Sequence, residues 1–272
     1  MANPAFSQSP AFSENARKSV AVPPVPQAPS ASELDAQFAI PAATADEMGR
    51  MTYQDTIVKT VVSFVILVAG AAVGWVFPIL GIPGAIAGFV LALVLIFRRK
   101  PSAPLTLSYA AAEGLFVGAI SAFFASYFGN GIVPMAVFGT LAVVGLTLGL
   151  FASGKVRASK RATQIFLVAM LGYLAFSLVN VVLIWTGVSD SMFGIRDEAI
   201  PGTNIPWGIP LGILVVLLAA YSLVIDFEQV KTGVQRGATR AFGWTAAFGI
   251  MLTVIWLYLE ILRLASYFMP RS

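Results

Sequence analysis

The stretch TVIWLYLEILRLASYF, residues 253–268, decides what kind of fold this chain can adopt. It is apolar enough to cross a membrane, yet it carries Glu260 near its middle and Arg263 three residues later. Residues three apart lie on one face of a helix, so the two charges can pair. A charged group at the bilayer centre costs about 2.5–3.5 kcal/mol and usually faces the bundle interior or a water-filled cavity. The stretch therefore predicts a membrane-spanning helix whose charges have a structural or a functional purpose.

The composition of the whole chain indicates a polytopic membrane protein. Of its 272 residues, 58% are hydrophobic and only 11% are charged, against about 25% charged residues in soluble proteins. Neither Cys nor His occurs. Their absence excludes disulfides, the usual zinc sites, Cys nucleophiles and a His-based hydrolase triad. Any proton chemistry must therefore fall to carboxylates, and we expect neither a cofactor nor an enzymatic activity.

Seven apolar runs are long enough to cross the bilayer, which takes about 20 helical residues. They predict an all-α integral membrane protein with seven transmembrane helices within residues 53–270. The runs are Ile57–Phe77, Leu80–Phe97, Leu105–Phe128, Ile132–Ala152, Ala162–Trp185, Trp207–Phe227 and Gly243–Met269. Residues 1–52 are rich in Pro, Ser and Ala and have no apolar period, which predicts a disordered tail.

The basic residues alternate between the connections and so indicate the orientation. The connections after spans two, four and six carry ten of them: Arg98, Arg99, Lys100, Lys155, Arg157, Lys160, Arg161, Lys231, Arg236 and Arg240. The opposite connections carry Arg196 beside Asp190, Asp197 and Glu198. Because the basic set faces the cytoplasm, the N-terminus is predicted to be cytoplasmic and the C-terminus outside. The net charge of +4 is thus a topology signal, and we expect no nucleic-acid partner.

Glycines four residues apart recur inside the spans. They occur in GAAVG (70–74), GAIAG (84–88) and EGLFVG (113–118). Such pairs let helix backbones approach closely. We interpret them as packing positions within the bundle.

Few charges remain at membrane depth once the connections and the tail are assigned. They are Glu113, Asp226, Glu260 and Arg263. Asp226 ends an apolar run, so it is an interfacial carboxylate or a functional one. Glu113 is a lone protonated acid or the partner of a basic residue such as Arg98. Arg263 pairs with Glu260 or extends toward the outer headgroups.

Two carboxylates that converge in one cavity would form a titratable site. Such a pair can share a proton and titrate as a coupled unit. Deprotonated, it provides hard oxygen ligands suited to Ca²⁺; protonated, it can close through a hydrogen bond and exclude the cation. We therefore expect Asp226 and Glu260 to sense protons and to contact Ca²⁺, with Arg98, Glu113 and Arg263 as tuning or latching residues.

The chain resembles the Bax inhibitor (transmembrane Bax-inhibitor motif) family in its bacterial branch, over residues 53–270. The resemblance rests on IDFEQVKTG (225–233) and LYLEILRL (257–264), helped by FRRK (97–100) and AAEGLFVGAIS (111–121). It implies a bundle whose last helix is central, in a bacterial plasma membrane. It also implies a pH-sensitive calcium leak gated by an acidic pair, Asp226 and Glu260, with Arg98 where the family places a latching base. Glu260 replaces the more usual Asp, and Arg263 stands where Asn is common.

Other functions remain open on the sequence alone. A non-conducting regulator would bind membrane proteins or a membrane protease, and Glu260 with Arg263 would then be a structural pair. An intramembrane aspartyl protease is disfavoured because the second acid is Glu and the GxGD and PAL elements are absent. A proton-coupled carrier would be expected to have an internal repeat or a pair of broken helices, and neither is evident.

Overall fold

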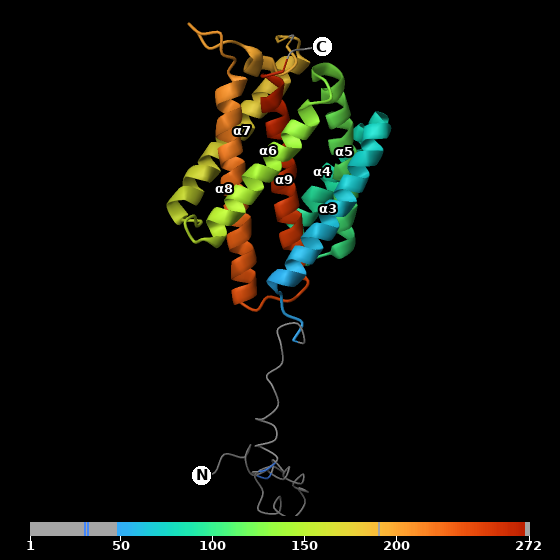
Figure 1. Cartoon of the computed structure of the whole chain (residues 1–272), viewed down its shortest axis with the longest axis vertical. Helices are drawn as coiled ribbons and strands as arrows, with labels where there is room; N and C mark the ends of the chain where they lie inside the picture. The colour runs from blue at the N-terminus through green and yellow to red at the C-terminus, as the bar shows by residue number, and fades with distance from the viewer. Residues whose placement is uncertain (1–29, 31, 33–47, 190, 270–272) are drawn as a thin grey trace, which may run out of the picture. The chain divides into compact units, whose positions relative to one another are not determined.

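Seven long helices form the bundle of this chain (Figure 1). The computed structural model describes residues 30, 32, 48–189 and 191–269. The elements are α3 (Tyr53–Val76), η3 (Pro78–Leu80), α4 (Gly81–Phe97), α5 (Ala103–Phe128), α6 (Ile132–Ala152), α7 (Lys160–Trp185), η4 (Gly194–Asp197), α8 (Gly208–Gln235) and α9 (Phe242–Ser266). All seven α-helices are long and apolar enough to cross a membrane. The predicted all-α membrane fold with seven spans is confirmed.

The bundle belongs to one compact unit within residues 44–272. Most of the predicted tail, residues 1–52, lies outside the described residues.

The sixth span is longer than its apolar run predicts. The run ends at Phe227, whereas α8 continues to Gln235. The polar continuation FEQVKTGVQ contains no proline, and its one glycine, Gly233, costs only about 1 kcal/mol within a helix, so the helical hydrogen bonds continue beyond the apolar part. Asp226 consequently lies nine residues, or about 14 Å, before the end of the helix.

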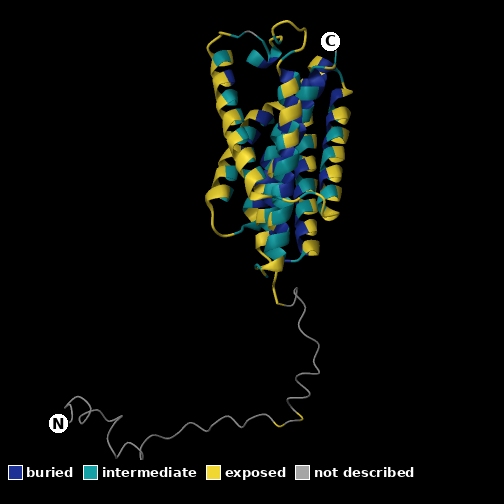
Figure 2. Cartoon of the chain, turned by 90° about the vertical axis from the view of Figure 1, so that its left-hand side faces the viewer, coloured by how far each residue is buried: buried dark blue, intermediate teal, exposed yellow. Residues whose placement is uncertain are grey.

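The last helix supplies much of the bundle core. α9 packs against α3, α5, α6 and α8, while α4 packs on α5. Met251, Leu257 and Leu262 of α9 are fully buried, and the exposed apolar residues cover the outer surfaces of the helices (Figure 2). Enclosure of the last helix by all six others is not confirmed.

Glycines bring α3, α4 and α5 into close contact. A Cβ atom at Gly118 of α5 would collide with the backbone of Ala71, and one at Gly70 would lie 2.8 Å from the Ala111 carbonyl oxygen. Gly84 of α4 approaches Ala112 of α5 in the same way. The interpretation of these glycines as packing positions is confirmed.

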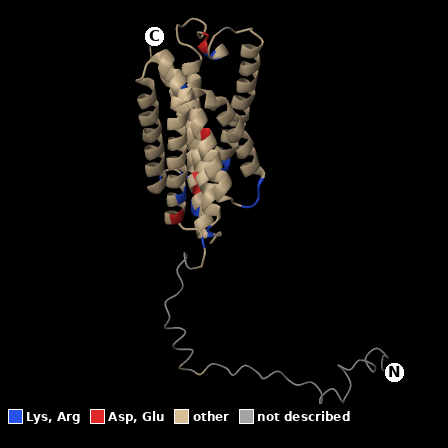
Figure 3. Cartoon of the chain, turned by 90° about the vertical axis from the view of Figure 1, so that its right-hand side faces the viewer, with Lys and Arg blue, Asp and Glu red and all other residues tan. Residues whose placement is uncertain are grey.

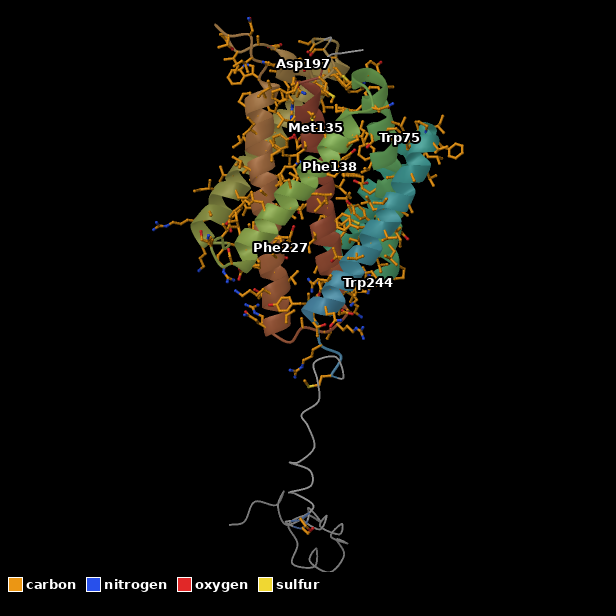
Figure 4. All side chains as sticks on the ribbon, in the orientation of Figure 1. Trp75, Met135, Phe138, Asp197, Phe227 and Trp244 are labelled. Carbon is orange, nitrogen blue, oxygen red and sulfur yellow. The ribbon has the colours of Figure 1, made fainter. Side chains whose placement is uncertain are left out.

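Lysine and arginine residues gather toward one end of the bundle (Figure 3). We call this end, which holds the α4–α5, α6–α7 and α8–α9 connections, the basic end. The opposite end holds the α7–α8 connection with η4, and we call it the loop end. Asp197 lies at the loop end and Trp244 toward the basic end (Figure 4).

An ion-pair cluster joins α3 to the α8–α9 connection at the basic end. Thr52 caps α3 by accepting a hydrogen bond from the Asp55 N–H at 3.2 Å. The Asp55 carboxylate pairs with Lys59 Nζ at 2.5 Å and with Arg240 Nε at 2.8 Å. Lys59 Nζ also donates to the Arg240 carbonyl oxygen at 2.6 Å. This cluster holds the start of α3 against the start of α9.

Replacement of Asp55 by asparagine is expected to destabilise the protein by about 2 kcal/mol, because the buried Lys59 loses its anionic partner. The measurement is the thermal unfolding of purified protein in detergent, followed by tryptophan fluorescence. The matched control is Glu228→Gln at the same end, whose pairs with Arg157 and Lys231 are partly exposed and contribute about 1 kcal/mol or less after solvent screening. Equal losses in the two variants would contradict the assigned role of Asp55.

Candidate functional site: two polar sites along the last helix

The first polar site surrounds Glu260 in the half of α9 nearer the loop end. Glu260 is 3% exposed. Its carboxylate accepts hydrogen bonds from the Tyr173 hydroxyl of α7 and from Arg263, one turn further along α9. Arg263 Nη2 also donates to the Tyr173 hydroxyl at 3.0 Å. The predicted pairing of Glu260 with Arg263 is therefore present.

A second arginine reaches the same carboxylate from the α7–α8 connection. Arg196 of η4 is 3% exposed, and its Nη1 lies 4.0 Å from Glu260 Oε2. Its Nη2 donates to the Tyr173 hydroxyl at 3.1 Å and to Ser177 Oγ at 3.3 Å. Glu260 is thus hydrogen-bonded by Arg263, while the Arg196 guanidinium lies close by with its Nη1 making no hydrogen bond. Both positive charges offset the cost of burying the carboxylate.

The neighbourhood of this cluster also contains Asp197 and Tyr267. Asp197 Oδ2 accepts a hydrogen bond from the Phe193 N–H at 3.1 Å. Burial, followed by the nearby Asp197 carboxylate, raises the pKa of the Tyr267 hydroxyl. Tyr267 therefore stays neutral at physiological pH, and the charged groups of this cluster are Arg196, Arg263, Glu260 and Asp197.

The second polar site surrounds Asp226 of α8, nearer the basic end. Thr253 Oγ1 of α9 donates a hydrogen bond to Asp226 Oδ2 at 2.7 Å, and Ser222 Oγ lies 3.4 Å from the same threonine hydroxyl. Asp226 lines a cavity of about 150 Å³ together with Gln229 and seven other residues. Unlike Glu260, Asp226 forms no ion pair with the described residues. It is a half-buried carboxylate with a hydroxyl donor and open space beside it.

The segment before α3 forms one wall of this cavity. Met51, which is 3% exposed, lines it. The Met51 N–H donates to the Ala238 carbonyl oxygen at 2.7 Å, and the Arg240 N–H donates to the Gly49 carbonyl oxygen at 2.8 Å. Residues 49–51 therefore pair with the α8–α9 connection and limit access to Asp226 from the basic end.

An apolar layer separates the two sites. Thr253 and Glu260 are seven residues apart on α9, about 10 Å along its axis. Between the two levels, Leu257 of α9 packs against Ala219 and Leu223 of α8, and all three side chains are fully buried. Asp226 and Glu260, expected to form one gating and Ca²⁺-binding pair, are therefore not brought together in this conformation.

The other predicted tuning residues lie apart from both acids. Arg98 ends α4 at the basic end, and its Nε donates to the Lys100 carbonyl oxygen at 3.1 Å. Glu113 of α5 packs against Gly88 of α4, where a Cβ atom would collide with its carboxylate. Of the predicted latching and tuning residues, only Arg263 contacts one of the two acids.

Sequence reasoning missed three residues of these sites. Arg196 was counted only as a loop charge, although it is the one basic residue of the connections opposite the basic set. Tyr173 shares one helix face with Ser177 and Asn180, but this spacing alone does not distinguish a site from ordinary packing residues. Thr253 has no such pattern around it. The isolation of Arg196 among acidic neighbours was the one available signal.

The chemistry of the two sites differs. The Asp226 site offers a carboxylate, a hydroxyl and an amide beside a cavity, which are oxygen ligands that suit a hard cation. Within the described residues, no group of three or more acidic residues comes together as a closed metal site. At the Glu260 site the carboxylate is already bonded by Arg263 and faces a second guanidinium, that of Arg196, at 4.0 Å. The Asp226 site can therefore receive a cation from its cavity, whereas at the Glu260 site a cation would have to displace an arginine.

Together, the seven apolar helices and the buried carboxylates on the last two of them define a polytopic membrane protein with intramembrane acidic sites. The sequence matches the family model described as Bax inhibitor 1 like over residues 3–270. The chain belongs to this family. A comparison with curated proteins finds no significant match.

Proposed function

We propose that this protein is a pH-sensitive cation leak channel, with Ca²⁺ as its permeant ion. The observation that carries the proposal is Asp226, a carboxylate inside a membrane-spanning helix that borders a cavity and has no paired cation among the described residues. An intramembrane acid of this kind is a functional candidate by default, because burying it has a cost that a purely structural site would avoid.

Protonation of Asp226 would control the entry of the cation. In its ionised form the carboxylate, with the Thr253 hydroxyl and the Gln229 amide nearby, attracts a hard divalent cation into the cavity. In its protonated form the attraction is lost. The leak is therefore expected to increase as the pH rises through the titration of Asp226.

The conformation of the bundle corresponds to a closed channel under this proposal. The layer of Ala219, Leu223 and Leu257 blocks the route between the Asp226 cavity and Glu260. A dry apolar constriction of this kind is a barrier to ions until the helices separate and water enters. Opening would bring the two acids onto one continuous polar path.

Calcium flux into liposomes tests the proposal. Wild-type protein is expected to leak faster at about pH 8 than at about pH 6, because ionised carboxylates attract the cation. Asp226→Asn is expected to leak slowly at both values. The control is Glu228→Gln. Glu228 lies two residues from Asp226 and pairs with Arg157 and Lys231, so this variant should keep the pH dependence of the leak. Absence of flux at either pH, with folded protein, would contradict the channel.

A non-conducting regulator of other membrane proteins is the second candidate. The pairing of Glu260 with both Arg196 and Arg263 favours it, because a fully paired acid fits a structural role. Under this alternative the partner is a membrane protein or a membrane protease, and neither Asp226→Asn nor Glu260→Gln would change a flux.

The bacterial plasma membrane is the proposed location. The basic end would face the cytoplasm, according to the positive-inside rule. This orientation puts the N-terminus and the Asp226 cavity on the cytoplasmic side, and the C-terminus and the loop end outside. The Asp226 cavity would then respond to cytoplasmic pH.

A further inference from the structure

The described part of the α7–α8 connection, residues 186–189 and 191–207, folds back onto the bundle. Asn180 of α7 anchors it, since its Nδ2 donates to the Phe193 carbonyl oxygen at 3.0 Å and its Oδ1 accepts from the Ile195 N–H at 2.9 Å. Gly194 lies between these bonds with a positive φ of 65°, and a Cβ atom there would collide with Asn180. The anchor thus fixes η4 and turns Arg196 toward the bundle.

Arg196 fills a site made by three different elements. Its guanidinium carbon lies 5.2 Å from the ring centre of Tyr173 and 5.3 Å from that of Phe176, both on α7. Its Nη2 donates to Tyr173 and Ser177, and its Nη1 lies 4.0 Å from the Glu260 carboxylate without a hydrogen-bond partner. A planar guanidinium can stack on aromatic rings and pair with a carboxylate at once, which a lysine cannot reproduce. The side chain thereby joins the connection to both α7 and α9.

The helix α7 depends on these contacts for its attachment. Of its side chains, all within the described residues, only Asn180 is buried. Tyr173, Ser177 and Asn180 are spaced four and three residues apart, so they share the helix face that meets Arg196 and the connection. Near the basic end, Thr163 contacts the Tyr221 hydroxyl of α8 at 3.1 Å. Polar contacts rather than an apolar seam therefore hold the loop-end half of α7.

We propose that Arg196 is a detachable latch that closes the loop end of the bundle by occupying Glu260 and clamping α7. Its guanidinium lies beside the carboxylate on the loop-end side, where its charge repels an arriving cation. Release of the latch frees the α7 face at Tyr173 and Ser177 and opens Glu260 to solvent from the loop end. Arg196 is a positioning residue that acts through Glu260.

The consequence for transport rests on the proposed function. In a cation leak, the latch is the barrier at the loop end, and it acts independently of the apolar layer and the Asp226 cavity. A cation passing through must displace Arg196 from Glu260. Removal of Arg196 is therefore expected to increase the leak.

The absence of cysteine from the chain allows a direct test. Ser177→Cys is introduced into the full-length protein in lipid nanodiscs, and a small, charged methanethiosulfonate reagent reports its exposure to water. With Arg196 present the thiol is expected to react slowly. Arg196→Gln is expected to raise its reaction rate roughly tenfold, the change in open population that loss of a latch contact produces. Arg196→Lys keeps the charge but loses the planar guanidinium that stacks on Tyr173 and Phe176, so it should give an intermediate reaction rate.

Controls separate a latch from general loosening. Arg236→Gln, an exposed arginine of the basic end, should leave the rate unchanged. A cysteine at Ser63, fully buried in α3, should stay protected in every variant. If Arg196→Gln does not fold, Asn180→Ala is used in its place, because it removes the anchors of the connection while retaining Arg196 and Glu260. This variant should also raise the reaction rate of the thiol at position 177. An unchanged rate in a folded variant, or an equal rise at position 63, would overturn the latch.

Flux measured on the same proteins distinguishes the two proposals. A faster thiol reaction without flux in any variant would support the latch and refute the leak channel. A pH-dependent flux without a change in thiol reactivity would support the channel and refute the latch.

Discussion

Gly118→Leu is expected to prevent stable packing of α3 on α5, with a loss of about 3 kcal/mol or more. Even a Cβ atom at this position would collide with the Ala71 backbone, and a backbone cannot move aside as a flexible side chain can. Because lipid provides no hydrophobic drive for helix association, close backbone contact is a main source of stability here. The measurement is the thermal midpoint of purified protein in detergent.

Gly172→Ala is the matched control for this prediction. Gly172 lies in α7, and no atom lies within 4 Å of the position that a Cβ atom would take there. Alanine favours a helix over glycine by about 1 kcal/mol. The control should therefore unfold at the same temperature as the wild type or slightly above it. A Gly118→Leu protein as stable as the control would show that the α3–α5 contact is not as close as described.

Glu260→Gln is expected to lower the free energy of unfolding by about 3–5 kcal/mol. The substitution keeps the size of the side chain and removes the charge that Arg196 and Arg263 both face. Two guanidinium groups then remain near each other without their shared carboxylate, and the Tyr173 hydroxyl donates to a neutral amide oxygen instead of a charged carboxylate. The loss of folded protein on heating, followed by size-exclusion chromatography, measures the effect.

Glu198→Gln provides the comparison at the same end of the bundle. Glu198 is exposed and adjoins the same connection, so its replacement should change stability by about 0.5 kcal/mol or less. If Glu260→Gln were as mild as Glu198→Gln, the buried cluster of Glu260 with the two arginines would not be the stabilising feature assigned here.

The spans could be predicted from the sequence because their apolar runs are long and few polar residues interrupt them. Ile132–Ala152 has the bounds of α6. The end of α8 could not be found in this way, because hydropathy ends at Phe227 while the hydrogen-bonded helix continues to Gln235. Lys59 was overlooked because it stands in an otherwise apolar run, and because its partner Arg240 is far away in the sequence.

The individual site residues could be recognised more easily than their grouping. Scarcity of charge identifies Asp226, Glu260 and Arg263 as unusual inside the membrane. Whether the two acids meet depends on how far α8 and α9 are shifted along their axes relative to each other. The residue spacing within one helix does not determine that shift. Arg196 required knowledge of how a long connection folds, because its role comes from Asn180, Tyr173 and Glu260 together.

In the proposed channel, the apolar layer of Ala219, Leu223 and Leu257 closes the route between the Asp226 cavity and Glu260. Leu257→Ser tests it most directly, because it places a hydroxyl in the layer at the position between Thr253 and Glu260. We expect the calcium leak of this variant in liposomes at about pH 8 to rise roughly tenfold, equivalent to about 1.4 kcal/mol off the barrier. Asp226→Asn in the same protein should reverse the rise, and Leu217→Ser, on the exposed face of α8, should leave the leak unchanged. A folded Leu257→Ser protein that leaks no faster than the wild type would contradict the account.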